Sequence, residues 1–286
     1  MKPLQQTLVW LLLALVCNGA SAATDLLNIT YATTAGKTLR LDLHLPTGTR
    51  RPPLVIYVHG GAWSAGDKTQ YPAFLVERGY AVASIDFRST DEAPFPANLH
   101  DIKACIRFLR ARAGNYGYDG QHIALSGASS GAHLAALVGV TADDKALEGT
   151  LGDYPGTSST VQAIVSWFGA SNLTTILAQS TPFGLSVREP ALRKLLGDAP
   201  DKVPDIARLA SPVFHINKGD PPALLLHGDQ DRQMPINQLH ELQGAYEAAD
   251  LKVETLILHG VGHDSGPFFS GDASEVVVAF LRRTIG

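Results

Sequence analysis

Short uninterrupted apolar runs constrain the fold of this chain more than any other feature of its sequence. They occupy residues 54–58, 80–85, 122–125, 161–168, 223–226 and 253–258. Runs of this length are typical of strands that are buried on both faces of a parallel sheet. Apolar residues at three- and four-residue spacing lie between them, at 96–112, 132–140, 235–249 and 273–283, and predict helices. The alternation predicts one α/β domain whose parallel sheet is covered by helices.

Two segments depart from this alternation. Residues 39–45 alternate leucine with polar residues, which predicts a strand in an antiparallel edge region, with leucines on one face and solvent on the other. In residues 170–217, Pro, Gly, Ser and Thr interrupt short helical fragments. Because this stretch lacks a long apolar pattern of its own, we interpret it as a cap-like insertion over one end of the sheet.

The first 22 residues have the pattern of a secretory signal. Lys2 precedes an apolar stretch at 8–16, and the segment ends in small residues up to Ala22. The stretch is shorter than the roughly 20 residues that cross a bilayer as a helix, so we expect cleavage near Ala22 and no stable membrane anchor. The mature domain would span residues 23–286 and be secreted or periplasmic. Cleavage would leave Cys105 as the only cysteine, which we interpret as a buried, inert thiol.

Composition excludes several classes of partner. With 286 residues, 45% of them hydrophobic and 17% charged, the chain can form a large folded core. The net charge is only −4 and neither sign gathers into a run, so nucleic acid is not an expected partner. The histidines lack the spacing of a zinc site, and there is no phosphate-binding glycine loop, so no cofactor or metal is expected. The sequence does not indicate an oligomeric state.

A candidate nucleophile lies where a predicted strand meets a predicted helix. Residues 127–131 read Gly-Ala-Ser-Ser-Gly, which is the G-x-S-x-G pattern centred on Ser129. A serine on such a tight turn projects its hydroxyl at the carboxyl edge of the sheet, where open parallel sheets bind ligands. The motif alone could be a chance turn in a chain rich in Gly and Ser. The flanking strand and helix favour the nucleophile.

A run of small residues follows the strand at 54–58. It reads His-Gly-Gly-Ala-Trp at 59–63 and leaves backbone N–H groups available to point into a cavity. An acyl-transfer enzyme needs such donors, because the carbonyl oxygen gains negative charge when it is attacked. We assign the oxyanion hole to the N–H groups of Gly61, Ala62 and Ser130. The alternative is an ordinary Gly-Gly turn.

A serine nucleophile also needs a base, and the base needs a carboxylate. Of the ten histidines, His263 lies in the loop after the last predicted strand, from which its ring can reach Ser129; the alternative is a surface histidine. Two aspartates, Asp229 and Asp231, follow the strand at 223–226. We prefer Asp231, which lies further into the loop, and expect Asp229 to cap or brace that turn. The order Ser, Asp, His is that expected of α/β-hydrolases.

These motifs resemble the α/β-hydrolase superfamily, and within it the esterases with an H-G-G-x-W motif, including the bacterial feruloyl-esterase-like (BD-FAE) group and the arylformamidases. The similarity covers most of the mature chain, at residues 41–46, 59–63, 87–88, 92–97, 101, 127–134, 220–222 and 227–231. It implies a mostly parallel eight-stranded sheet with helices on both faces and a small cap. It also implies the same roles for Ser129, Asp231, His263, and for Gly61 and Ala62. This chain departs from the family at Ser166 and at residues 169–172, where relatives often carry an acidic residue and a Gly-Pro-Thr-Asp turn.

Three functional hypotheses follow. The first is an exported carboxylesterase that acts through an acyl-enzyme on short-chain, aryl or feruloyl esters, either small molecules or esters linked to polysaccharide. The second is arylformamidase-like cleavage of N-formyl amides, which the motif also suits but export disfavours. The third is a non-catalytic binding module on a hydrolase scaffold, since a fold does not establish an activity.

Overall fold

The computed structural model describes residues 24–286, so the expected signal at 1–22 lies outside the described residues. Eight strands form one sheet in the order β1-β2-β4-β3-β5-β6-β7-β8. Strand β2 pairs antiparallel with β1 and β4, and the remaining pairs are parallel. The strands are β1 (Thr24–Thr34), β2 (Lys37–Leu45), β3 (Pro53–Val58), β4 (Ala81–Ile85), β5 (Asp119–Ala128), β6 (Ala163–Trp167), β7 (Ala223–Gly228) and β8 (Val253–Leu258). The mostly parallel α/β sheet predicted from the sequence is therefore confirmed.

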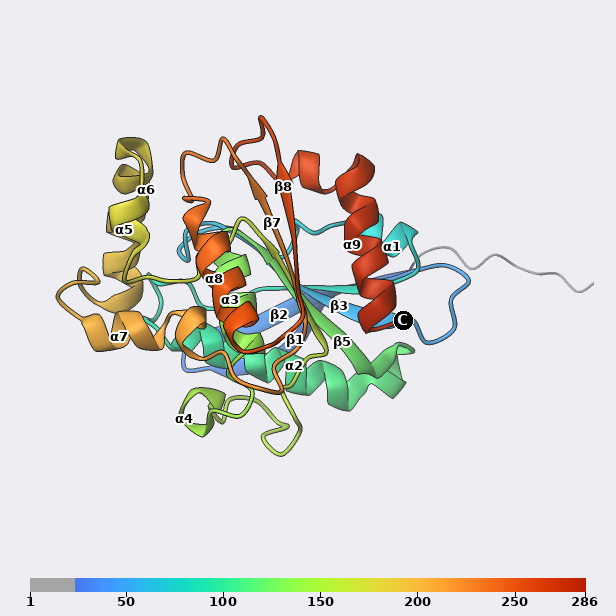
Figure 1. Cartoon of the computed structure of the whole chain (residues 1–286). Coiled ribbons are helices and arrows are strands. Elements are labelled where there is room, and N and C mark those ends of the chain that lie inside the picture. Colours follow the sequence, from blue (N-terminus) through green and yellow to red (C-terminus); the bar gives the residue numbers. More distant parts are fainter. Residues whose placement is uncertain (1–23) are drawn as a thin grey trace, which may run out of the picture.

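Helices cover both faces of this sheet, which is seen nearly edge-on in Figure 1. Helices α2, α3 and α8 pack on one face, and α1 and α9 pack on the other. Successive residues of a strand therefore pack into hydrophobic cores on opposite faces of the sheet. Ile56 of β3 packs with α2 and α3, whereas Val55 packs with α1 and α9. The helices are α1 (Phe74–Glu77), α2 (Ala97–Tyr116), α3 (Ser130–Gly139), α4 (Lys145–Glu148), α5 (Ile176–Gln179), α6 (Pro182–Leu196), α7 (Pro204–Leu209), α8 (Asn237–Ala248) and α9 (Gly271–Thr284), with 3₁₀ turns η1 (Pro212–Phe214) and η2 (Gly266–Phe268).

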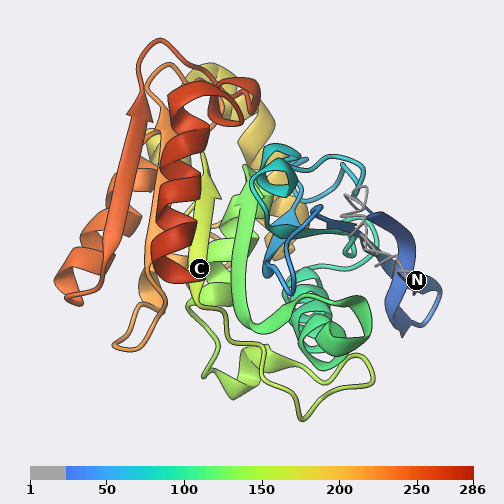
Figure 2. The same cartoon turned by 90° about the vertical axis from the view of Figure 1, so that its right-hand side faces the viewer.

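The two ends of the sheet differ from the sequence prediction. Strand β1, which the prediction lacks, forms the edge outside β2, and β8 forms the opposite edge (Figure 2). The prediction that the polar face of β2 is exposed holds for Arg40 but was wrong for Asp42 and His44, which are buried. Asp42 accepts a hydrogen bond from Lys68, and His44 stacks on Tyr71. The prediction that β8 is buried on both faces was also wrong, because Glu254 and Thr255 are exposed at the sheet edge and the other residues of β8 are only partly buried.

Residues 170–217 contain α5, α6, α7 and η1, which project beyond the α8 side of the sheet (Figure 1). Buried hydrogen bonds tie the start of this segment to α8. The Oε1 atom of Gln238 accepts bonds from the N–H groups of Ser171 and Asn172, at 2.9 and 2.8 Å. The turn at 169–172, where the chain departs from the resembling family, is therefore held by a side chain of the main domain.

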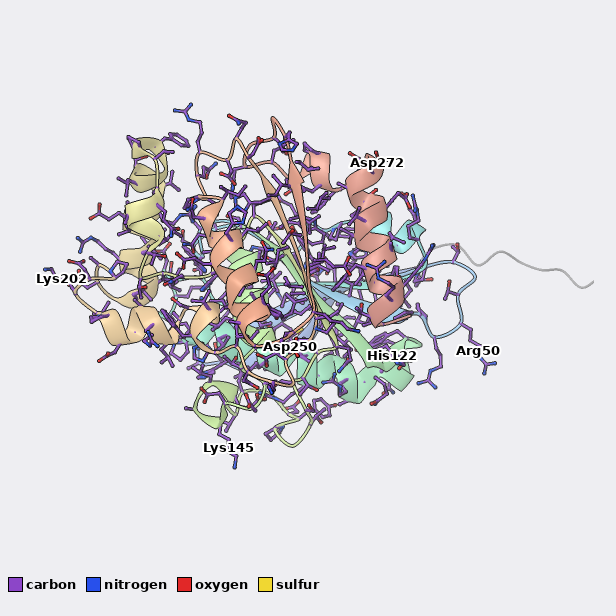
Figure 3. The ribbon with its side chains drawn as sticks, viewed as in Figure 1. Arg50, His122, Lys145, Lys202, Asp250 and Asp272 are labelled. Atoms are coloured by element: carbon purple, nitrogen blue, oxygen red, sulfur yellow. The ribbon has the colours of Figure 1, made fainter. Side chains whose placement is uncertain are left out.

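Charge is confined largely to the outside of the molecule. Side chains such as Arg50, Lys145 and Lys202 extend from the periphery into solvent (Figure 3). The predicted burial of Cys105 is confirmed, and this burial raises the pKa of its thiol well above the usual value. Among the helices of residues 24–286, none is long and apolar enough to cross a membrane.

Candidate active site

Ser129 stands between the end of β5 and the start of α3, in a strained backbone conformation with φ 54° and ψ −121°. A non-glycine residue at positive φ is uncommon and costs free energy that the surrounding structure must supply. The neighbouring glycines permit this turn. A Cβ atom on Gly127 would lie 2.5 Å from the carbonyl oxygen of Gly131, and one on Gly131 would lie 2.1 Å from that of Val58. Any side chain at these two positions would collide with backbone.

The structure brings the three predicted residues Ser129, His263 and Asp231 into contact. Ser129 Oγ lies 2.9 Å from His263 Nε2, and His263 Nδ1 lies 2.6 Å from Asp231 Oδ2. Because a carboxylate accepts hydrogen bonds, Nδ1 carries the proton, and Nε2 is left as an acceptor for the serine hydroxyl. This is the tautomer in which an imidazole can remove a proton from Ser129.

The carboxylate of Asp231 is buried and strongly held in its ionised form. Burial by itself raises the pKa of Asp231, but hydrogen bonding with His227 and His263 and the amide of Met234 outweighs it and leaves the pKa well below the usual range. His227 Nε2 lies 3.5 Å from Asp231 Oδ2 and donates to the carbonyl oxygen of Met234 at 3.0 Å. Asp231 therefore remains negatively charged at neutral pH and can orient His263.

The other aspartate of this loop has a separate role. Asp229 accepts a hydrogen bond from the N–H of Gly260 at 2.8 Å and lies 2.7 Å from Nδ1 of His259, a ring that is 87% exposed. It therefore braces the turn after β8 and makes no contact with His263 within the described part of the chain.

The loop after β3 has three consecutive residues in the left-handed region: Gly61 (φ 118°), Ala62 (φ 52°) and Trp63 (φ 61°). A Cβ atom on Gly61 would lie 2.1 Å from the carbonyl oxygen of Ala65, so only glycine fits there. Within residues 24–286, the N–H groups of Gly61, Ala62 and Ser130 have no hydrogen-bond acceptor. These three predicted donors are therefore free to bind a negatively charged oxygen.

Trp63 anchors this loop in a way that the sequence reasoning missed. Its Nε1 donates to His133 Nδ1 at 3.0 Å, and His133 Nε2 lies 2.7 Å from the carbonyl oxygen of Ala210. Burial lowers the pKa of His133 to about 4, so this ring is neutral and both of its nitrogens are used. The H-G-G-x-W motif contains Trp63 but does not by itself predict this anchoring role.

Ser129 and His263 open into a cavity of about 580 Å³. Apolar walls come from β3, from the residue after β6 and from α6, and polar groups come from Arg188 of α6 and from the surrounding loops. The lining residues are Tyr57, Gly60, Gly61, Ala62, Ser64, Ala65, Gly66, Gln70, Ala128, Ser129, Phe168, Val187, Arg188, Gln233, His263 and Ser265. Gln70, Arg188 and Gln233 have no sequence motif that could have placed them here. In residues 24–286, no group of three or more His, Cys, Asp or Glu side chains could hold a metal ion.

The sheet order and the serine, histidine and aspartate at its carboxyl edge define an α/β-hydrolase. A carbohydrate esterase from gut microbiota, solved in truncated form, superposes with a TM-score of 0.82 and 32% identity over 92% of this chain and 96% of that chain. Esterase 2 of the Planctomycetes species Thermogutta terrifontis, with propionate bound, gives a TM-score of 0.70 and 25% identity over 93% of this chain and 94% of that chain.

A family model identifies the family of this chain within the α/β-hydrolases. The BD-FAE model matches residues 41–246, more than half of the chain, and the chain belongs to this family. Esterase LipC of Mycobacterium tuberculosis (strain ATCC 25618 / H37Rv) is 30% identical over 220 residues, which cover 75% of this chain and 53% of that protein. Isoprenylcysteine alpha-carbonyl methylesterase ICME of Arabidopsis thaliana is 29% identical over 239 residues, covering 78% of this chain and 53% of that protein. The chain thus spans about half the length of the curated relatives it matches.

Proposed function

We propose that this protein is an exported serine carboxylesterase that acts through an acyl-enzyme. The observation that carries the proposal is the unbroken line of contacts from Asp231 through His263 to Ser129, at 2.6 and 2.9 Å. Family membership supports it, because the similar proteins named above are esterases.

The reaction takes place in two steps. The Oγ atom of Ser129 attacks the ester carbonyl carbon while its proton moves to Nε2 of His263, and the amides of Gly61, Ala62 and Ser130 bind the resulting oxyanion. When the C–O bond to the alcohol breaks, His263 returns the proton to the leaving oxygen. Water then gives a proton to His263 and attacks the acyl-enzyme, and collapse of the second intermediate releases the acid and restores the hydroxyl of Ser129.

We propose short-chain and aryl esters, including feruloyl and acetyl esters attached to polysaccharide, as substrates. The cavity of about 580 Å³ combines apolar walls at Tyr57, Phe168 and Val187 with polar groups and is in the size range of small-molecule sites. The structural neighbours include a carbohydrate esterase and an esterase with propionate bound.

The signal pattern at 1–22 supports export. We expect a mature protein that begins near Ala23, which mass spectrometry of the secreted protein would test.

Three variants test the mechanism. Ser129→Ala should reduce hydrolysis of 4-nitrophenyl acetate to a trace and abolish labelling by a fluorophosphonate. His263→Ala should reduce kcat by at least about a thousandfold, whereas His259→Ala, the matched control from the exposed His259–Asp229 pair, should keep wild-type activity. A Ser129→Ala protein that retains the activity contradicts the proposed nucleophile. Failure of the wild-type protein to label would favour the binding-module hypothesis.

A substrate series separates esters from amides. We expect turnover of acetyl, butyryl and feruloyl esters to exceed that of N-formylkynurenine at equal concentration. A faster reaction with N-formylkynurenine than with methyl ferulate would identify the arylformamidase alternative instead.

A further inference from the structure

Arg188 is a buried cation on the wall of the catalytic cavity. It lies on α6, within the insertion, and only 1% of its surface is exposed. It lines the same cavity as Ser129 and His263. Moving a guanidinium out of water costs several kcal/mol unless a partner compensates, so its position calls for an explanation.

The described residues compensate this charge only in part. Nη2 donates to the carbonyl oxygen of Gln233 at 3.2 Å, and the guanidinium carbon lies 5.7 Å from the centre of the Trp63 ring. Nε and Nη1 are buried and have no hydrogen-bond partner among residues 24–286. Burial lowers the pKa of Arg188 to about 10, and the nearby charge of Asp231 opposes this shift, so the group remains positive at neutral pH. Asp231 itself accepts hydrogen bonds from His263 and from backbone amides.

The charge on the described lining of the cavity is positive. Its described lining contains no Asp or Glu, and Arg188 is its only Lys or Arg. A positively charged wall with unpaired N–H donors favours an anionic ligand, because hydrogen bonds from arginine to a carboxylate are stronger than hydrogen bonds between neutral groups.

We propose that Arg188 forms a subsite for a carboxylate carried by the substrate, so that this protein prefers negatively charged esters to neutral esters of the same shape. The inference rests on the proposed ester hydrolysis and adds the substrate class. The carboxylate belongs to the acyl part or to the alcohol part of the ester, and the experiment below distinguishes the two.

Two matched substrate pairs provide the test. Monoethyl succinate carries a carboxylate on the acyl side, and ethyl 4-methylpentanoate replaces that carboxylate with an isopropyl group. Acetoxyacetate carries it on the alcohol side, and isobutyl acetate is its neutral counterpart. Acid release in a pH-stat gives kcat and KM for each ester with the wild-type protein, Arg188→Met and Arg188→Lys. Arg193→Met is the matched control, because Arg193 lies on the same helix with an exposed side chain.

For at least one pair, we expect Arg188→Met to lower the charged-to-neutral ratio of kcat/KM by about tenfold to a hundredfold. Arg188→Lys should retain part of the ratio, and Arg193→Met should keep the wild-type value. A ratio unchanged in Arg188→Met overturns the proposal. An equal loss on both members of each pair also overturns it, because Arg188 would then only support Trp63 and Gln233.

The wild-type protein decides the question if Arg188→Met does not fold. At least one charged ester should then show a lower KM than its neutral counterpart, and a higher KM in both pairs overturns the proposal. No turnover of any of the four esters would instead contradict the proposed ester hydrolysis, so the two failures are distinguishable.

Discussion

Replacing Trp63 with phenylalanine tests whether the hydrogen bond to His133 holds the oxyanion loop. The Nε1 atom of Trp63 donates to His133 Nδ1 at 3.0 Å, and both side chains are buried. Because His133 is neutral and donates its other N–H to Ala210, the variant leaves Nδ1 buried without a donor. A buried acceptor left unsatisfied costs about 1–3 kcal/mol of the free energy of unfolding.

The chain offers a matched control for the lost ring volume. Trp167 is also fully buried, but its Nε1 has no hydrogen-bond partner among the described residues. Trp167→Phe therefore loses the same part of the indole without breaking a hydrogen bond. In urea unfolding at pH 7, we expect Trp63→Phe to be less stable than Trp167→Phe by at least about 1 kcal/mol. We also expect kcat on 4-nitrophenyl acetate to fall about tenfold or more in Trp63→Phe, because the amides of Gly61 and Ala62 lose their anchor.

Equal loss of stability in the two variants would refute this reasoning, since the hydrogen bond would then contribute nothing beyond packing. A Trp63→Phe protein that is destabilised but keeps its kcat would separate the two claims. In that case the bond would stabilise the fold without positioning the oxyanion donors.

Three further substitutions have outcomes that follow from the structure. Burial raises the pKa of Asp220 from 3.8 to about 6, so its carboxylate lowers stability as pH rises from 4 through 6; Asp220→Asn should be more stable by about 1 kcal/mol at pH 8, after allowance for its partial exposure, with no gain at pH 4 in thermal melts. Gly131→Ala would place a Cβ atom 2.1 Å from the carbonyl oxygen of Val58, so we expect neither soluble protein nor fluorophosphonate labelling, and normal labelling would contradict the clash. Gln238→Ala leaves two buried N–H groups unsatisfied and should cost about 2–4 kcal/mol in urea unfolding, whereas Gln243→Ala, which breaks one solvent-exposed hydrogen bond on the same helix, should change little.

The sequence predicted the centre of the sheet better than its edges. Central strands such as β3 and β4 are mostly apolar because both of their faces are covered, and such a run can be recognised without knowledge of the neighbouring strands. Strand β1 has two register shifts against β2, at Leu26/Ile29 and Thr30/Ala32, so its side chains do not alternate with a constant period. Asp42 and His44 look like exposed positions by sequence alone. Their burial depends on partners distant in sequence, including Lys68 for Asp42 and Tyr71 for His44.

The candidate site was predictable where its geometry is local. The turn at Ser129 is encoded by five consecutive residues, and the loop at 59–63 follows its strand directly, so motif and position suffice. The choice between Asp229 and Asp231 depended on their depth in one loop, and the structure places the preferred one against His263. Arg188 could not be predicted, because its approach to the cavity depends on how α6 packs against segments more than a hundred residues distant in sequence.

The insertion and the oxyanion loop are parts of one structural unit. Residues 170–217 are linked to Trp63 in two ways. Arg188 lies over the ring of Trp63, and Ala210 accepts a hydrogen bond from His133, the partner of Trp63. A rigid displacement of this segment would expose the Arg188 charge and break the Ala210–His133 contact, which leaves the Trp63 hydrogen bond without its fixed acceptor. The insertion is therefore better understood as a fixed wall that helps to position Gly61 and Ala62 than as a lid that opens independently of them. Arg188 thus contacts the tryptophan that anchors the oxyanion loop and is also the charged residue on the cavity wall.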